Sequence, residues 1–191
     1  HTASHNHGQG HETTFAQIAS GTLGIPMEKI RLRTSEPDTN LVANPTGGSR
    51  TLHGLGSAVL LAAREIVQKG LDLAAEELEA AKADLEFGEG EYRIRGTDRR
   101  IAITALAMKH PGKLDLDFKE RPKVPSTFPN GCHIAEVEIE PETGEVEIVS
   151  YLACDDAGNL INEQIVHGQM HGGITQGAGH IFHEQAVYDS G

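Results

Sequence analysis

The sequence predicts an α+β fold in which helices are layered on mixed or antiparallel sheets. Helical and strand-like segments alternate along its 191 residues, yet the strands pair mostly as local hairpins, at residues 84–94 and 135–154. Local hairpins favour layered helices and antiparallel strands over a doubly wound parallel sheet. We expect residues 1–125 to form a first α+β half, and residues 126–191 to add a hairpin and a glycine-rich helix, in the same domain or beside it.

Composition and charge exclude several classes of partner. Acidic residues number 28 against 16 basic ones, which gives a net charge of −12. A field of that sign repels nucleic acid and anionic lipid, so we expect neither as a partner. No apolar run approaches the roughly 20 residues of a membrane span. Cys132 and Cys154 fit no CxxC pattern and predict no disulfide framework, so a cytoplasmic, reducing setting is the expectation.

Apolar spacing predicts the elements before the first hairpin. Residues 13–23 have the periodicity of a helix, and Gly24 follows it. The alternation of Ile30 and Leu32 with arginines predicts a strand with one buried face. Residues 35–48 lack an apolar period and predict a long loop.

A second long helix is predicted to begin at Ser49, as its N-cap, and to end before Gly70. Residues 71–83 are amphipathic and acidic, which predicts a separate, solvated helix. Residues 103–109 are expected to form a short helix, and residues 113–124 a connector with an edge strand.

The clearest strand signal lies in the last third of the chain. Glutamates alternate with Ala135, Val137 and Ile139 before a turn, and a second strand answers them. A last helix is predicted over residues 163–184, followed by a strand at residues 185–188.

Two glycine-rich segments each lead into a predicted helix, at Gly8-Gln9-Gly10 and at Thr46-Gly47-Gly48-Ser49. Glycine lets the backbone approach a bound group, and a helix start offers unpaired N–H groups and a positive dipole end. Two such entries can cradle two ends of one anionic ligand, although each can also be a simple turn. Gln9 and Gln176 lie in glycine-rich settings, and their carboxamides suit a heterocycle or an oxo group as well as a helix surface.

Other chemistry-bearing residues are given a plainer interpretation. His1, His5, His7 and His11 crowd the start, and His167 and His171 lie four residues apart; both sets can bind a metal, but surface histidines are the commoner case. We therefore predict no metal site. The acids of Asp155-Asp156 are expected to be a solvated turn, Cys154 a small strand residue, and no catalytic residue is assigned.

Three separated blocks together resemble one family. Residues 8–13 (Gly-Gln-Gly-His-Glu-Thr) resemble its GQGxxT block, and residues 44–51 resemble its second cofactor loop. Residues 131–177 resemble its third block. The family is the molybdopterin-binding subunit of the molybdenum hydroxylases, which includes xanthine dehydrogenase, aldehyde oxidase and the carbon monoxide dehydrogenase large chain. The motifs of this sequence resemble the carbon monoxide dehydrogenase branch most.

The resemblance implies a molybdopterin cofactor with molybdenum, often in the cytosine dinucleotide form in bacteria. It also implies hydroxylation with water-derived oxygen, and iron–sulfur and flavin subunits as partners. The implied cofactor-binding residues are Gly8, Gln9, Gly10, Thr46, Gly47, Gly48, Ser49, Arg50 and Gln176.

The chain also departs from the family pattern. The family subunit is several times longer, and its glutamate base lies in a later block; Glu12, Glu136 and Glu163 do not match that motif. The strand expected before Gly8 is absent, which leaves residues 1–6 without a partner and predicts self-association through an exposed edge.

Two functions therefore stay open. The chain is either a partial molybdopterin-binding subunit of an oxidoreductase acting on an aldehyde, an N-heterocycle or carbon monoxide, inactive alone, or a non-catalytic domain that folds and self-associates without cofactor.

Overall fold

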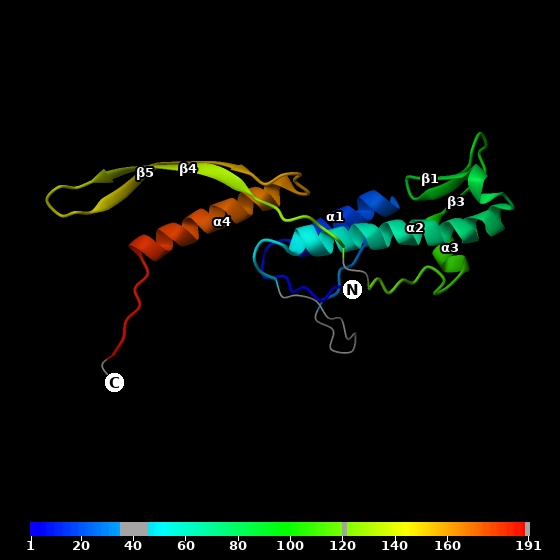
Figure 1. The fold of residues 1–191 in the computed structure, drawn as a ribbon, viewed down its shortest axis with the longest axis horizontal. Helices are drawn as coiled ribbons and strands as arrows, with labels where there is room; N and C mark the ends of the chain where they lie inside the picture. Colours follow the sequence, from blue (N-terminus) through cyan, green and yellow to red (C-terminus); the bar gives the residue numbers. More distant parts are fainter. Residues whose placement is uncertain (35–45, 120–121, 190–191) are drawn as a thin grey trace. The chain divides into compact units, whose positions relative to one another are not determined.

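Four α-helices and two antiparallel sheets make up the described part of the chain, which confirms the predicted α+β class (Figure 1). The computed structural model describes residues 1–34, 46–119 and 122–189. They fall into two compact units, one of His1–Val124 with Gln164–Gly191 and one of Pro125–Glu163. The expected division into residues 1–125 and 126–191 concerns folding domains and stays a prediction.

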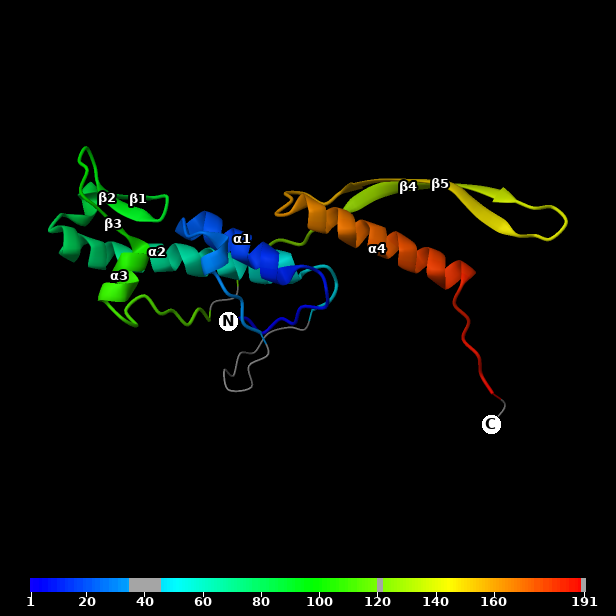
Figure 2. The same cartoon turned by 180° about the vertical axis from the view of Figure 1, so that it is seen from behind.

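Helix α1 (His11–Leu23) packs along helix α2 (Ser57–Leu78), as both views show (Figures 1 and 2). Their contact is close at Gly56, where an added Cβ would lie 3.2 Å from the Cδ1 of Ile18. A short π-helical turn, η3 (Leu52–Gly56), leads directly into α2. Helix α1 begins two residues earlier than its apolar periodicity predicts, because His11 lies in its first turn.

The predictions for both ends of the second helix are wrong. Ser49 does not cap it: its φ is +52°, and the helical residues begin at Thr51, just before η3. Gly70 does not end it either, because α2 continues to Leu78 and absorbs most of the separate helix predicted over residues 71–83. Its C-cap is Glu79, in the left-handed conformation.

The core of the larger unit lies between α2 and a three-stranded sheet. Strands β1 (Leu85–Gly88), β2 (Glu91–Ile94) and β3 (Arg100–Ala102) are antiparallel in the order β1-β2-β3, and helix α3 (Ile103–Lys109) follows directly. The hairpin and α3 are confirmed, whereas β3 has no predicted counterpart. The buried core residues are Ala74, Leu78, Leu85, Tyr92, Ile103 and Leu106.

Tyr92 is the central residue of this core. It is fully buried, and its ring lies 4.7 Å from that of Phe87. Its hydroxyl donates to the Val67 carbonyl at 2.7 Å. A Cβ at Gly70 would lie 2.2 Å from the Tyr92 hydroxyl oxygen, so Gly70 is a packing site inside α2 and not a helix end. Burial raises the pKa of the Tyr92 phenol, which therefore stays neutral.

The end of α1 contacts the turn between β1 and β2. Glu89 and Gly90 both have positive φ, of +51° and +79°, which is typical of a tight two-residue hairpin turn. Gly24, in the left-handed conformation, ends α1 against that turn, and a Cβ on it would meet the Gly90 nitrogen at 2.0 Å. This contact joins α1 to the sheet.

The strand predicted around Ile30 and Leu32 does not form. The chain instead makes a 3-10 turn, η1 (Met27–Lys29), and then a single parallel bridge between Thr2 and Thr34. The Thr2 nitrogen donates to the Arg33 carbonyl at 2.9 Å. The prediction that residues 1–6 have no partner is therefore wrong as well. Of the long loop predicted over residues 35–48, residues 35–45 lie outside the described part.

The smaller unit is a long hairpin. Strand β4 (Asn130–Ile139) pairs antiparallel with β5 (Val146–Asp156), which confirms the strongest strand prediction. A bulge lies between Glu136 and Val137, and nearly every residue of both strands is exposed. The unit thus contains no buried core of its own among its described residues.

Helix α4 (Glu163–Phe182) confirms the last predicted helix, and it has no buried residue. The strand predicted at residues 185–188 is wrong, since these residues have no regular structure. The edge strand predicted within residues 113–124 does not appear in residues 113–119 or 122–124. No helix in the described ranges is long and apolar enough to cross a membrane.

Glu77 links α2 to the end of α3, and this link predicts a pH effect. Its carboxylate pairs with Lys109 and, at 2.9 Å, with the Nε2 of His110. The hydrogen bond from Lys109 is the largest cause that lowers the pKa of Glu77; desolvation opposes the shift, and the hydrogen bond from His110 adds to it. Because the pKa is lower in the folded state, the pair contributes fully to stability at pH values above the unfolded-state pKa of about 4.3. This contribution is lost as pH falls through the folded-state pKa.

Glu77→Gln is therefore expected to lower the melting temperature slightly at pH 7, with the difference from the parent vanishing in acid below the folded pKa. Thermal unfolding followed by circular dichroism between pH 7 and pH 3 measures this. Glu76→Gln, one position away and exposed, is the control; an equal effect of both variants would contradict the pairing.

Candidate functional site

The first glycine-rich segment forms a tight loop that ends at the start of α1. Gly8 and Gly10 have φ of +98° and +76°, and Gly10 is the N-cap. The Gln9 carboxamide folds back on this loop: its Oε1 accepts from the His7 nitrogen, and its Nε2 donates to the His5 carbonyl at 3.3 Å. Gln9 thus orders the loop backbone in this structure.

This loop offers a ligand open space above its backbone and uncapped N–H groups at the start of α1. A Cβ on Gly8 would meet no atom within 4 Å, so the space above the backbone is open. No side chain caps α1, so its first N–H groups face the loop end without such a partner. The carboxylate of Glu12 lies in the same first turn.

Thr46 joins the second glycine-rich segment to the chain just before the first. Its hydroxyl lies 2.6 Å from the hydroxyl of Ser4, and it donates to the His5 carbonyl at 2.9 Å. Ser4 is completely buried. Thr46 is therefore hydrogen-bonded to residues that precede it by 42 and 41 positions, and both predicted loops begin near this one point. We call Ser4, His5 and Thr46 the loop junction.

The rest of the second segment is open. Gly47, Gly48, Ser49 and Arg50 are exposed, and a Cβ on Gly47 or Gly48 would meet no atom within 4 Å. Gly48 and Ser49 both have positive φ, of +64° and +52°. The backbone therefore turns sharply here without side-chain cover.

His11 is the buried polar group nearest to the first loop. It is 4% exposed and stacks on Phe15, with ring centroids 5.1 Å apart. Its Nδ1 is buried without a hydrogen-bond partner within the described ranges. Desolvation lowers the pKa of His11, although a hydrogen bond to the His5 backbone opposes the shift, so the ring is neutral at pH 7. A neutral imidazole can accept or donate one further bond at such an atom.

Gln176 and the histidines of α4 lie on a different element from the residues of the loop junction. Gln176, His167 and His171 are exposed, and no hydrogen bond between described residues ties Gln176 to either loop. Helix α4 does approach the first loop at its own start: a Cβ on Gly10 would lie 2.6 Å from the Cδ1 of Ile165. The structure thus brings the two glycine-rich segments together, but not Gln176.

The remaining candidates do not form a metal site within the described ranges, where no group of three or more His, Cys, Asp or Glu is suited to an ion. Of the solvated turn predicted at residues 155–156, the exposure is confirmed but the turn is wrong, because both residues end strand β5. The Asp155 carboxylate accepts from the Nε2 of His133 at 2.9 Å, and the Nδ1 of that ring lies 2.9 Å from the Tyr151 hydroxyl.

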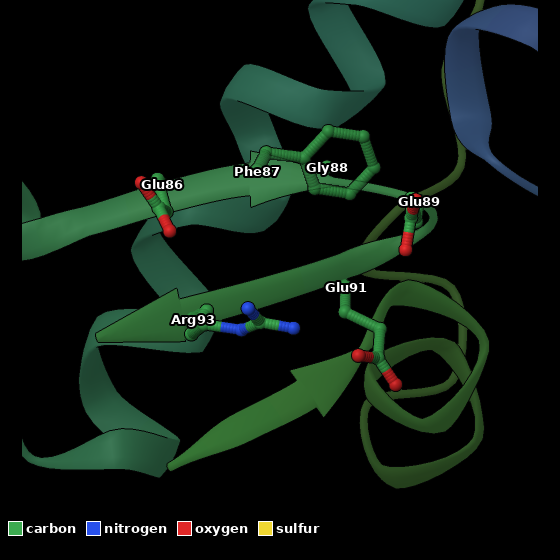
Figure 3. Close-up of a pocket in the computed structure, with 6 residues that line it drawn as sticks. All are labelled: Glu86, Phe87, Gly88, Glu89, Glu91 and Arg93. Atoms are coloured by element: carbon green, nitrogen blue, oxygen red, sulfur yellow. The ribbon is translucent and has the colours of Figure 1, made fainter. Parts of the chain in front are cut away.

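A shallow hollow on strands β1 and β2 contains none of the predicted site residues. Figure 3 shows its lining residues, which are Glu86, Phe87, Gly88, Glu89, Glu91 and Arg93. Carboxylates outnumber the single guanidinium there, so the hollow does not favour an anion.

Sequence reasoning overlooked two residues at or beside the junction, Ser4 and His11. Ser4 carries no local signal, because only the fold brings Thr46 to it. The cluster of four histidines at the start suggests a surface position for His11, although its place four residues before Phe15 is compatible with a buried helix face.

Comparison with known proteins identifies the domain. A family model described as the molybdopterin cofactor-binding domain matches residues 1–191. The chain belongs to this family of carbon monoxide dehydrogenase and xanthine dehydrogenase large subunits.

Its relatives support the assignment over the whole chain. The molybdopterin-binding domain is 34% identical to the carbon monoxide dehydrogenase large chain of Hydrogenophaga pseudoflava, over 96% of this chain and 24% of the relative. It is 35% identical to the nicotine 6-hydroxylase large subunit of Paenarthrobacter nicotinovorans, over 96% and 24%. Reconstituted CO dehydrogenase from Oligotropha carboxidovorans matches in structure with a TM-score of 0.83 and 32% identity, over 97% and 24%. The chain thus spans about a quarter of the relatives' length.

Proposed function

We propose that this chain forms one wall of the cofactor site in the large subunit of a molybdenum hydroxylase, and that it is inactive without the remaining segments. The observation that carries this proposal is the loop junction, because it ties both glycine-rich segments of a molybdopterin-binding family domain to one point.

The open glycines of the two loops and the buried His11 suit a pterin with a phosphate. Open backbone above Gly8, Gly47 and Gly48 leaves room for a flat ring or a phosphate against N–H donors. The unpartnered Nδ1 of His11 is a buried polar atom of the kind that a bound heterocycle can satisfy. These residues would hold the cofactor, whether or not it carries a cytosine dinucleotide, with Gln9, Gly10, Ser49, Arg50 and Gln176.

The bound cofactor would supply the molybdenum centre for hydroxylation by water-derived oxygen. This chain's own residues would bind and orient it and exclude water from one side. Glu12, Glu136 and Glu163 do not match the motif of the family's glutamate base, so we assign no general base in this chain. The proton-accepting group would come from the missing segments.

The proposed partners are those missing segments, together with iron–sulfur and flavin subunits. The relatives named above are themselves large chains or subunits. The exposed apolar residues of the hairpin, among them Val137, Ile139 and Ile148, are 47%, 57% and 38% exposed and suit such a contact or self-association.

Thr46→Val is expected to weaken cofactor retention about fivefold, because it keeps the side-chain shape and removes the junction hydroxyl. One net hydrogen bond is worth about 1 kcal/mol, and about 1.4 kcal/mol corresponds to tenfold in affinity. The measurement is molybdenum and pterin content after coexpression with the complementary segments of a relative.

The matched control is Thr143→Val. Its hydroxyl also serves a loop, as acceptor from the Glu145 nitrogen at 3.2 Å, but in the hairpin turn. Equal loading of both variants would count against the junction.

The second candidate function is a non-catalytic domain that self-associates without cofactor. The molybdenum content of the coexpressed chain distinguishes it from the proposed cofactor-binding role. We expect the purified chain alone to oxidise no aldehyde, purine or carbon monoxide, and the coexpressed chain to contain molybdenum. A coexpressed chain that remains free of molybdenum, while the relative's own domain loads, would favour the non-catalytic alternative.

A further inference from the structure

The two cysteines of the chain lie directly opposite each other in the hairpin. Cys132 in β4 and Cys154 in β5 are Cα partners in the antiparallel register, and both are exposed free thiols. Directly opposed residues in such a ladder have Cα atoms about 4.5–5.5 Å apart. Disulfides bridge Cα separations of about 4.4–6.8 Å, so either kind of opposed pair is within reach of a bond.

The register also gives both thiols the same orientation. Side chains alternate between the two faces of a strand, and opposed residues share a face. Cys132 and Cys154 therefore share one face with the next pair, Ile134 and Leu152, which are 57% and 61% exposed. His133, bonded to Tyr151 and Asp155, lies on the other face. Both thiols are exposed, as are Ile134 and Leu152 beside them.

We propose that Cys132 and Cys154 form a reversible dithiol site whose substrate is a low-molecular-weight disulfide such as glutathione disulfide. The thiolate of one cysteine attacks a sulfur of glutathione disulfide, forms a mixed disulfide and releases one glutathione thiolate. The second cysteine thiolate attacks the protein sulfur of that mixed disulfide, closes the cross-strand bond and releases the other glutathione thiolate. The two cysteines lose two electrons, glutathione disulfide gains them, and the two thiol protons pass to the released glutathione.

The bond would act on the part of the chain that is held together least by burial. The hairpin has nearly all its residues exposed, and a two-stranded hairpin without a packed face is only marginally stable. A bond at Cys132 and Cys154 closes a loop that contains the bulge and the turn, and it ties the strands near the ends farthest from that turn. Oxidation is therefore expected to restrict separation of β4 from β5.

The test treats the 191-residue chain with glutathione disulfide at neutral pH and follows thiol titration, intact mass and a non-reducing peptide map. The expected result is loss of both thiols, one peptide pair linked through Cys132 and Cys154, no retained glutathione and no covalent dimer. Cys132→Ser and Cys154→Ser should each retain one glutathione instead.

A register control makes the test specific. Cys154→Ser combined with Ala153→Cys moves the second thiol by one residue and hence to the opposite face. This variant should retain two glutathiones and form no linked pair. Retention of two glutathiones by the parent chain, covalent dimers of the parent, or an equally efficient linked pair in the shifted variant would each overturn the proposal.

Discussion

Gly70→Ala is expected to destabilise the larger unit by about 2 kcal/mol, even though alanine is the better helix former. The added methyl carbon would lie 2.2 Å from the Tyr92 hydroxyl, inside contact distance, and would push that hydroxyl off the Val67 carbonyl. Overpacking of a core costs about 1–3 kcal/mol, and the lost hydrogen bond about 1 kcal/mol. The helix-propensity gain of about 1 kcal/mol offsets only part of this. Urea unfolding followed by circular dichroism measures the change.

Two variants separate the packing cause from a general effect of removing a helical glycine. Gly21 lies inside α1 with no atom within 4 Å of an added Cβ, so Gly21→Ala should stabilise by up to about 1 kcal/mol. Tyr92→Phe removes the clashing oxygen, so Gly70→Ala should cost less in that background. If Gly70→Ala stabilised the unit as Gly21→Ala does, the account of this core would be wrong.

The second large effect is expected at Gly48, and it concerns cofactor content. Gly48→Val adds a branched side chain where φ is +64° and where the open backbone is proposed to meet the cofactor. The conformation costs a non-glycine residue about 1–3 kcal/mol, and the side chain fills the ligand's space as well. We expect molybdenum and pterin content after coexpression to fall more than tenfold.

Gly144→Val is the matched control, because Gly144 also has positive φ, +75°, and open space around an added Cβ. It lies in the turn of the β4–β5 hairpin, so its backbone strain is similar but remote from the junction. Both variants should lose some thermal stability, and only Gly48→Val should lose cofactor. A parallel loss in the two variants would mean that strain, and not the site, governs loading.

Local signals were sufficient where the partner of a segment is its neighbour in sequence. Both hairpins and helices α1, α3 and α4 follow from spacing and turn residues alone. Gly70 was misjudged because its role depends on Tyr92, which packs against α2 from 22 residues away. The short strand β3 pairs with its sequence neighbour β2, but it has too few residues to show a period of its own.

The candidate site divides in the same way. The two glycine-rich segments are visible as motifs, and the resemblance gives them a cofactor. Tertiary packing produces the hydroxyl contact between Ser4 and Thr46, and it also buries the unpartnered Nδ1 of His11. No local sequence pattern predicts either feature. The isolated bridge from Thr2 to Thr34, which supports this junction, likewise replaces the longer strand that alternation predicted.

Amide hydrogen exchange on the coexpressed protein, with and without bound molybdopterin, measures whether the two loops contact the cofactor. Slower exchange on loading is expected in peptides covering residues 5–14 and 46–56, where the two loops and the helix starts lie. Peptides covering β1 to β3 should be unchanged. Protection confined to the β4–β5 hairpin or the sheet, with both loops exchanging as in the empty protein, would contradict the account.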